Sequence, residues 1–480
     1  MLNRRNLLKA AAGAGAVALF PWERVTAAAS GSAVAMGDAA PTTPFAHAMP
    51  LPPVLRPSFS TPTADVYRLR MAESSLEIVK GLRSTVRTYG GSLPGPTIKA
   101  VRGRKAIVHQ TNGLAVDTAV HLHGGHVRSE DDGLPMDTIA PGATRTYTYP
   151  NQQRAALLWY HDHAHHLEAE NVHMGLHGQY LITDEQERSL PLPKGRYDVP
   201  LVIRDARVEA DGTFVYTRPS DCPHLLVNGK ERPYFTVEAR KYRLRVLSAC
   251  VNRYLGLRFA DGAEFTQIGA DGGLLDAPVA RDSMTVMGGE RVDIVVDFSR
   301  YRAGSSVVLE NTLAGSGERT EVLRFDVVGA AEDPSSVPSR LSALPPVPRA
   351  DVEREFVLRT YPQMTINDKL YDPARVDVRT TLGSNEVWTV TNAEPPIARP
   401  DFHIWHSFHT HLVPFRVLDR NGRGPGPDDA GLKDTVTLAP GDTVRLAMTW
   451  SGYAGSYLYH CHQLGHSSSG QMGRIDVVAP

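Results

Sequence analysis

Four pairs of histidines stand out in this chain, each with one residue between its two members. The pairs are His121/His123, His161/His163, His409/His411 and His460/His462. In a β-strand, residues two apart point to the same face, so each pair directs two imidazoles into one volume. Neutral imidazole is a ligand for copper, zinc, iron and nickel. The spacing therefore predicts a metal cluster, and the histidines alone leave the identity of the metal open.

Cys461 lies between His460 and His462, so its side chain must point to the opposite face of the same strand. On that face His406 and His466 can join it. Two histidines, one thiolate and a weak axial ligand form the copper site of blue electron-transfer proteins. The tripeptide of residues 460–462 then connects this copper to the cluster behind it, so that one strand serves both metal sites.

The composition indicates a folded protein with many short strands. A chain of 480 residues corresponds to roughly three domains. The 51 Lys and Arg nearly balance the 52 Asp and Glu, so we expect no nucleic-acid partner, and 42% apolar residues argue against disorder. With 41 Gly and 35 Pro, turns are frequent, which favours strands over long helices. The best helix candidate is Leu167–Leu176.

One strand pattern occurs three times. Ile139–Tyr149, Val286–Phe298 and Leu438–Trp450 each contain a glycine turn followed by a β-rich strand. The aligned glycines, Gly142, Gly289 and Gly441, lie 147 and 152 residues apart, which corresponds to one domain per copy. Upstream of each copy lies a short apolar strand that ends near an Asn, at Ile107–Asn112, Arg245–Asn252 and Val387–Asn392.

These repeats predict an all-β chain of three tandem Greek-key β-sandwich domains. The expected organisation is a signal peptide at 1–29, a loose leader at 30–61, a first domain at 62–190, a second at 195–330, a linker at 331–349 and a third domain at 350–480. Aligning the copies places Cys461 opposite Asp162, so the first domain supplies histidines without a thiolate. The second copy, around Ser306–Glu310, has no histidine. We therefore expect the cluster at the interface of the first and third domains, with the middle domain as a spacer.

The N-terminus has the layout of an export signal. Arg4 and Arg5 precede the apolar run Ala10–Phe20 and the small residues Ala27–Ala29. The paired arginines resemble the twin-arginine type, which exports folded proteins. The apolar run is too short to span a bilayer, and no later stretch is long enough. We expect a periplasmic or extracellular protein that uses the twin-arginine export machinery and has no stable membrane insertion.

From about Thr63 to Ala479 the sequence resembles the multicopper oxidases of the three-domain laccase kind. Beyond the histidine motifs, the similarity to the spore-coat laccase and bilirubin oxidase branch lies in segments such as H-L-H-G-G, Y-P-N-Q-Q-R-A-A-L-L-W-Y-H-D-H, L-V-N-G-K, Q-I-G-A-D-G-G-L-L and F-R-V-L-D-R. The resemblance implies three cupredoxin domains, four coppers per chain, and one-electron oxidation of a small-molecule donor coupled to four-electron reduction of dioxygen to water.

The resemblance also assigns ligands by motif. It implies a type 1 copper held by His406, Cys461 and His466, a type 2 copper held by His121 and His409, and a type 3 pair held by His123, His161, His163, His411, His460 and His462. It places the axial type 1 ligand at Gln471, with Met472 as the alternative. The residues expected to carry the reaction are Asp132, His460, Cys461 and His462.

Proton delivery departs from the family pattern. Asp132 matches one family relay carboxylate, whereas the second relay position, directly after His466, is occupied by Ser467. We therefore expect a different route, through water or through Asp131.

Several polar residues remain unassigned by these motifs. His165, His166, His173 and His177, with Glu168, Glu170 and Met174, could form an auxiliary copper site or a solvated and partly packed segment. Cys222 and Cys250 could form a disulfide in an oxidising compartment, a question that the sequence leaves open.

Three classes of function compete. The favoured one is a laccase-like oxidase of phenols, aromatic amines or bilirubin-like pigments. The second, a cuprous-ion oxidase in copper tolerance, usually has a Met-rich segment, whereas the 11 Met of this chain are dispersed. The third, a non-enzymatic cupredoxin-like envelope protein, is disfavoured because every ligand position is filled. Substrate choice is expected in loops near the type 1 site, around Pro395–His403 and Arg420–Asp429.

Overall fold

The computed structural model describes residues 37–216, 222–251, 253–314, 320–395 and 404–480. The predicted signal peptide and positions 30–36 of the leader lie outside the described residues. So do Asn252 and most of the predicted substrate loop Pro395–His403.

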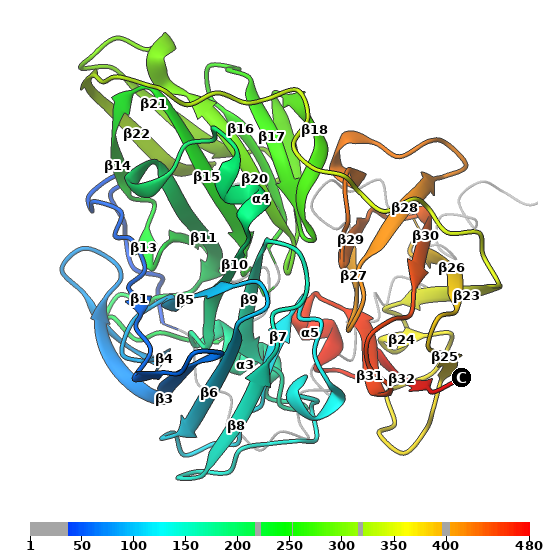
Figure 1. The fold of residues 1–480 in the computed structure, drawn as a ribbon. Coiled ribbons are helices and arrows are strands. Elements are labelled where there is room, and N and C mark those ends of the chain that lie inside the picture. The colour runs from blue at the N-terminus through cyan, green and yellow to red at the C-terminus, as the bar shows by residue number, and fades with distance from the viewer. Residues whose placement is uncertain (1–36, 217–221, 252, 315–319, 396–403) are drawn as a thin grey trace, which may run out of the picture. The chain divides into compact units, whose positions relative to one another are not determined.

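The first domain is a sandwich of two sheets (Figure 1). One sheet contains, in spatial order, β2 (Phe59–Ser60), β3 (Ala64–Glu77), β6 (Lys105–Asn112) and β8 (Thr144–Tyr149), with β4 (Arg83–Tyr89) paired to β3. The other contains β1 (Val54–Leu55), β5 (Gly95–Val101), β10 (His177–Thr183), β9 (Ala156–Asp162) and β7 (Val120–His123).

The second domain repeats this arrangement with more strands. Its larger sheet contains β13 (Lys230–Glu231), β12 (His224–Val227), β11 (Asp198–Ala206), β15 (Lys241–Ser248), β20 (Arg291–Asp297), β17 (Phe265–Ala270) and β18 (Gly273–Arg281). Its smaller sheet contains β14 (Tyr234–Ala239), β22 (Glu321–Ala330), β21 (Ser306–Asn311), β16 (Leu255–Phe259) and β19 (Ser283–Val286).

The third domain is again built from two sheets. The first contains β24 (Thr365–Ile366), β23 (Val352–Arg359), β26 (Asn385–Asn392), β30 (Thr443–Thr449) and β28 (Phe415–Arg420). The second contains β25 (Val378–Thr381), β32 (Met472–Val478), β31 (Gly455–Cys461), β27 (His406–Thr410) and β29 (Thr435–Leu438). The predicted all-β class with three sandwich domains is confirmed.

The helices of the described chain are short. They are α3 (Glu168–His173), α4 (Glu185–Ser189) and α5 (Leu464–Ser467), with single 3₁₀ turns η2 (Ser129–Asp131), η3 (Gly195–Tyr197), η5 (Phe298–Arg300) and η6 (Pro427–Asp429). The helix expected at Leu167–Leu176 corresponds to α3. None of the described helices is long and apolar enough to cross a membrane.

The sequence repeat corresponds to a repeat in strand pairing. β8, β20 and β30, which follow the three glycine turns, pair antiparallel with β6, β15 and β26, and these in turn pair parallel with β3, β11 and β23. The turn glycines all have a positive φ, of 80° at Gly142, 92° at Gly289 and 83° at Gly441, which explains why glycine recurs there.

The asparagines at the strand ends have the same structural task in the outer domains. The amide of Asn112 donates to the carbonyl of Ile139 at 2.7 Å, and the amide of Asn392 donates to the carbonyl of Leu438 at 3.1 Å. Each Asn thus ties the end of one strand to the segment that enters the glycine turn. Because both asparagines are fully buried, these bonds satisfy polar groups that water cannot reach.

The segment predicted to be a loose leader is instead bonded to two domains over residues 38–55, which we call the N-terminal strap. Its backbone N–H groups donate to the carbonyls of Val208 (from Ala40, 2.8 Å) and Tyr234 (from Met49, 2.7 Å) in the second domain. Further along, β1 pairs with β5 of the first domain. The expectation was wrong for these residues because backbone pairing of a Pro-rich stretch leaves no periodic pattern in the sequence.

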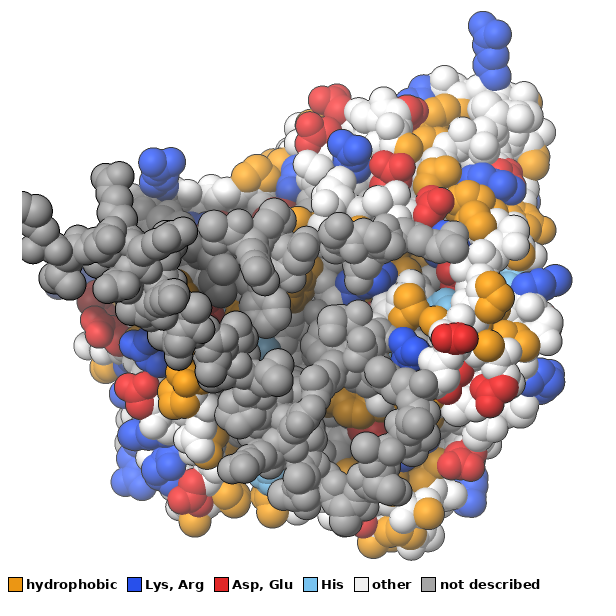
Figure 2. Space-filling model, turned by 180° about the vertical axis from the view of Figure 1, so that it is seen from behind, with side chains coloured by type: hydrophobic (Ala, Val, Ile, Leu, Met, Phe, Trp, Pro, Cys, Tyr) orange, Lys and Arg blue, Asp and Glu red, His pale blue; other side chains and the backbone are white. Residues whose placement is uncertain are grey.

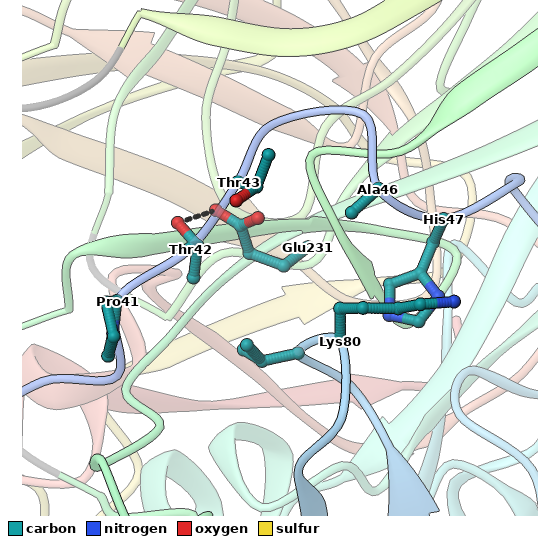
Figure 3. Close-up of a pocket in the computed structure, with 8 residues that line it drawn as sticks. Pro41, Thr42, Thr43, Ala46, His47, Lys80 and Glu231 are labelled. Atoms are coloured by element: carbon teal, nitrogen blue, oxygen red, sulfur yellow. Dashed lines mark hydrogen bonds between the residues drawn. The ribbon is translucent and has the colours of Figure 1, made fainter.

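The strap also lines a pocket of about 320 Å³ with Val79 and Lys80 of the first domain and Glu231 of the second (Figure 3). Thr42 of the strap donates from Oγ1 to Oε1 of Glu231 at 3.1 Å. The lining includes none of the predicted metal ligands.

The linker at 331–349 contains no helix or strand, as expected, yet it is held against other parts of the chain. Leu341 is buried in a cluster of second-domain side chains, and Arg154 of the first domain donates to Oγ of Ser342 at 2.8 Å.

On the face shown in Figure 2, the described Lys and Arg side chains alternate with Asp and Glu, in agreement with the balanced composition.

Candidate metal centre

Two pairs of antiparallel strands present the histidines. In the first domain, β7 and β9 pair with His121 opposite His161, and in the third domain β27 and β31 pair with His409 opposite His460. Residues opposite each other in a ladder share a face. The second member of each pair follows two residues later, within β7 for His123 and one residue beyond the strand end for the other three, so eight imidazoles extend from two sheet faces.

These eight histidines converge across the boundary of the first and third domains. Two groups have their potential ligand atoms within 4.8 Å of one another: His123, His161 and His462, and His163, His411 and His460. His121 and His409 lie together in a further group with His123. Each group contains residues of both outer domains, so neither domain alone could hold the cluster.

Oxygen atoms around the cluster fix the orientation of the imidazoles. Nδ1 of His121 donates to the carbonyl of Asp132 at 2.6 Å, and Nδ1 of His409 donates to the carbonyl of Asp434 at 2.8 Å. His161 uses its Nδ1 in the same way, on the carbonyl of Asp162 at 2.8 Å. An Nδ1–H that is bonded outward leaves Nε2 as the lone-pair nitrogen facing the centre.

His123 is turned the other way. Its Nε2 lies 3.0 Å from Oδ1 of Asp434 and 3.0 Å from Oγ1 of Thr435, while its Nδ1 lies 3.1 Å from Nε2 of His462. This histidine therefore directs Nδ1 into the centre, and Asp434 positions it from outside.

The polar atoms of this site fit a cluster of metal ions. Buried side-chain nitrogens without a hydrogen-bond partner are costly in a protein interior. Several such atoms gather here, namely Nε2 of His121, His161, His163 and His409. Metal ions that accept these lone pairs would account for all of them, whereas apolar packing would not.

Burial keeps these imidazoles in the form that binds metal. It lowers the pKa of His121, His161 and His409 well below the usual range, and neighbouring imidazoles lower it further. The pKa of His460 falls to about 4 for the same reason. Because neutral imidazole is the ligand form, the cluster is ready to bind metal at neutral pH.

The opposite faces of β27 and β31, together with α5, build a second group, of His406, Cys461 and His466. Sγ of Cys461 lies 3.4 Å from Nδ1 of His406 and 3.6 Å from Nδ1 of His466. Burial raises the pKa of the Cys461 thiol to about 12, so a bound cation is needed to hold it as a thiolate at neutral pH. The chemistry of this donor set is that of a blue copper site.

The register of β31 and β32 separates the two axial candidates. Met472 lies opposite His460, so its side chain shares the cluster face, and Gln471 lies beside Cys461, whose N–H donates to the Gln471 carbonyl at 3.1 Å. The amide nitrogen of Gln471 donates to the Arg359 carbonyl at 2.9 Å. Its Oε1 is buried and has no hydrogen-bond partner among the described residues. Burial lowers the pKa of His406 and His466, and the Gln471 side chain partly offsets this lowering.

Asp132 lies directly behind the cluster. Its Oδ2 accepts from Nδ1 of His411 at 2.6 Å, and burial raises its pKa well above the usual range. Asp131, the expected alternative in proton delivery, accepts instead from the backbone N–H of Thr148 at 2.8 Å and pairs with Arg128 at 3.0 Å. Neither of these partners belongs to the cluster.

The middle domain does more than separate the other two, and this corrects the sequence expectation of a spacer. A Cβ atom added at Gly289 would lie 2.9 Å from Cγ of His462 and 3.0 Å from Cε1 of His123. Arg291, fully buried, donates to Oδ2 of Asp434 at 2.6 Å, and thereby supports the carboxylate that positions His123. The sequence repeat does not predict these contacts, because Gly289 and Arg291 are not metal ligands and their partners belong to other domains.

Sequence reasoning also missed Trp159, which lies two residues before His161 on the same strand face. The indole stacks on the His161 ring with centroids 4.2 Å apart and is fully buried. Strand periodicity alone could have placed it beside the ligands. Asp434 carried no comparable signal, because its partners His123 and Arg291 belong to other domains.

The surplus histidines after His163 do not gather into one group of ligand atoms, which favours the packed segment over an auxiliary copper site. Among the described residues, no candidate metal group contains them. Their polar contacts go to separate partners: His166 to the Ser468 carbonyl, His173 to the Val215 carbonyl and His177 to Arg204, while Glu170 pairs with Arg87. Cys222 and Cys250 are both buried, and the structure has no disulfide between them.

Comparisons with known proteins agree on one family. Family models described as multicopper oxidase match residues 70–187 and 344–480, and a model of the twin-arginine translocation signal matches residues 1–21. The chain is 32% identical to a laccase of Bacillus subtilis over 91% of this chain and 99% of that protein. It is 34% identical to a bilirubin oxidase of Albifimbria verrucaria, over 90% and 81% of the two chains. A solved laccase structure from Pediococcus acidilactici is 30% identical and superposes with a TM-score of 0.84, covering 93% of this chain and 96% of that one.

Proposed function

Since the chain belongs to the multicopper oxidase family, we propose that it is a laccase-like enzyme that oxidises phenols, aromatic amines or bilirubin-like pigments one electron at a time and reduces dioxygen to water. The observation that carries this proposal is the convergence of ten histidines and one cysteine on two adjoining sites. The twin-arginine signal indicates export, so the enzyme works in the periplasm or outside the cell.

The donor groups support four coppers per chain. His406, Cys461 and His466 would hold the type 1 copper, and the buried Oε1 of Gln471 would be available as a further donor. The type 2 copper would be held by His121 and His409, and the type 3 pair by His123, His161 and His462 on one side and His163, His411 and His460 on the other. When bound, the coppers supply one-electron acceptance at the type 1 site and four-electron reduction of dioxygen at the cluster.

The Cys461 strand connects the two sites through covalent bonds. His460 belongs to one group of three histidines and His462 to the other, so the two neighbours of Cys461 reach both halves of the type 3 pair. The backbone of this tripeptide is thus the shortest covalent path from the thiolate to the cluster. His466 is only half-buried whereas His406 and Cys461 are fully buried, so the edge of His466 is where an electron donor can approach.

Copper loading and oxygen uptake test the function. We expect the loaded protein to show the visible thiolate-to-copper band and to consume dioxygen faster with a phenol than with cuprous ion. Faster uptake with cuprous ion would instead identify a metal oxidase. A copper-loaded protein that consumes no dioxygen with either donor would support the non-enzymatic alternative.

Replacement of Asp132 by Asn is expected to slow dioxygen reduction by about 10- to 100-fold, the usual cost of losing a residue that orients a metal ligand. The reason is that the carboxylate accepts the Nδ1–H of His411 and is positioned to deliver protons at the cluster. Reduction of the type 1 copper by a phenol should be unchanged. Stopped-flow absorbance measures the two half-reactions separately. If Asp132→Asn reduced dioxygen as fast as the wild type, this role of Asp132 would be refuted.

A further inference from the structure

Ser467 follows the predicted type 1 ligand His466 at a position where the sequence resemblance implies a carboxylate. In the structure, the buried hydroxyl of Ser467 donates to Oε2 of Glu168 at 2.5 Å. Glu168 begins α3 of the first domain, 299 residues earlier in the chain, and is 1% exposed. A carboxylate therefore does lie beside the His466 loop, and it comes from a different domain.

The second oxygen of the same carboxylate reaches the cluster. Oε1 of Glu168 lies 3.0 Å from Nδ1 of His163, within ion-pair distance, and neither atom has a hydrogen-bond partner elsewhere among the described residues that would draw it away. With Nδ1 facing Glu168, Nε2 of His163 is the nitrogen left for the group that it forms with His411 and His460. A metal-binding histidine commonly has its outer nitrogen fixed by a carboxylate in this way.

The helices that carry these residues are locked together, so the carboxylate has little freedom to turn away. The backbone N–H of Ala169 donates to Oγ of Ser468 at 3.0 Å, and Nδ1 of His166 donates to the Ser468 carbonyl at 3.0 Å. Four buried apolar side chains fill the space between α3 and α5: Ala169, Val172, Val251 and Leu464.

The carboxylate group of Glu168 faces the histidine cluster. Its two oxygens face His163 and the Ser467 hydroxyl. Among the described residues its ion-pair partner is His163, and no Lys or Arg lies within 4.0 Å of it. A buried anion needs a compensating positive charge, and the adjacent metal site would provide it.

We propose that Glu168 is a positioning residue for both copper sites: one carboxylate orients His163 of the cluster and, through Ser467, holds the loop that carries His466. This inference rests on the proposed function, because the ligands in question would bind copper. It assigns to α3 a task that neither the histidine motifs nor the sequence repeat required.

Chelator competition on the copper-loaded protein tests the inference without relying on turnover. Glu168→Gln keeps the shape and removes the charge, whereas Glu168→Ala removes both acceptors. We expect cluster copper to be lost at about 10- to 100-fold lower chelator concentration, with the larger effect in the alanine variant. The matched control is Glu170→Gln on the same helix, whose carboxylate pairs with Arg87 at 2.7 Å and should retain copper like the wild type.

An exchange variant separates positioning from mere packing. Glu168→Ser combined with Ser467→Glu conserves the side-chain volume and approaches the same hydrogen bond from the other side. We expect it to retain copper better than Glu168→Gln, because it keeps a carboxylate between the two sites, whereas a residue needed only for packing predicts that both of these volume-preserving variants retain copper like the wild type. Because the exchange and the Gln variant preserve volume, they remain informative if the alanine variant fails to fold.

The outcomes are distinct from those for the function itself. If the wild-type protein retains no copper, the proposed function fails. If the wild type binds copper and both Glu168 variants resist the chelator as well as Glu170→Gln does, the function stands and the role of Glu168 is overturned.

Discussion

Replacing Gly289 with alanine is expected to abolish copper binding at one half of the type 3 pair and to lower dioxygen reduction by about 100-fold. The added methyl group would lie within 3.1 Å of ring atoms of both His123 and His462, which belong to the same three-histidine group. Neither ring can yield without losing its direction, because Asp434 holds His123 and the backbone after Cys461 holds His462. Copper analysis and electron paramagnetic resonance of the loaded variant measure the loss.

The sequence repeat supplies matched controls for this prediction. Gly142 and Gly441 occupy the same turn in the outer domains, with positive φ values of 80° and 83°, and an added Cβ there meets no atom within 4 Å. Alanine at any of the three positions costs roughly 1–2 kcal/mol of backbone strain. Only Gly289→Ala should therefore lose copper. Equal copper content in all three variants would mean that the contact with the histidines has no consequence.

Replacing Cys461 with serine is expected to remove the visible thiolate-to-copper band and to reduce oxidation of any phenol to background. A serine hydroxyl is neither soft nor readily ionised, so His406 and His466 would be left without the thiolate that defines the site. The cluster should keep its copper, because its histidines lie on the opposite face of the strand. Absorbance and copper analysis of the same sample distinguish the two sites.

Cys250→Ser is the control for the loss of a buried thiol. Cys250 lies in the core of the second domain, outside all candidate metal groups of the described chain. This variant should retain both the band and the activity. If Cys461→Ser kept the visible band, the assignment of Cys461 as the copper thiolate would be wrong.

The histidine sites were predictable because their information is local. Two-residue periodicity places His121 with His123, and His460 with His462, on one face and Cys461 on the other, whatever the rest of the chain does. The repeat then indicated three sandwich domains, since β8, β20 and β30 each begin after a glycine that adopts a positive φ. Fold class and ligand types followed from these two regularities.

The residues behind the ligands were not predictable in the same way, because their partners are distant in the sequence. Glu168 contacts Ser467, and Arg291 contacts Asp434, and in each pair the two residues belong to different domains. Spacing within a strand says nothing about such pairs. The register of β31 with β32, which bears on the choice between Gln471 and Met472, is likewise not specified by a single sequence.

The N-terminal strap determines when the folding of this protein can be completed. A ribosome makes residues 38–55 early, but the carbonyls that the strap bonds, at Val208 and Tyr234, are synthesised much later. The strap therefore cannot form these bonds during its own synthesis. It pairs with strands of the first and second domains only after both domains have been made. Folding is thus completed only after most of the chain has been synthesised. This order agrees with an export route that carries folded proteins, not unfolded chains, across the membrane.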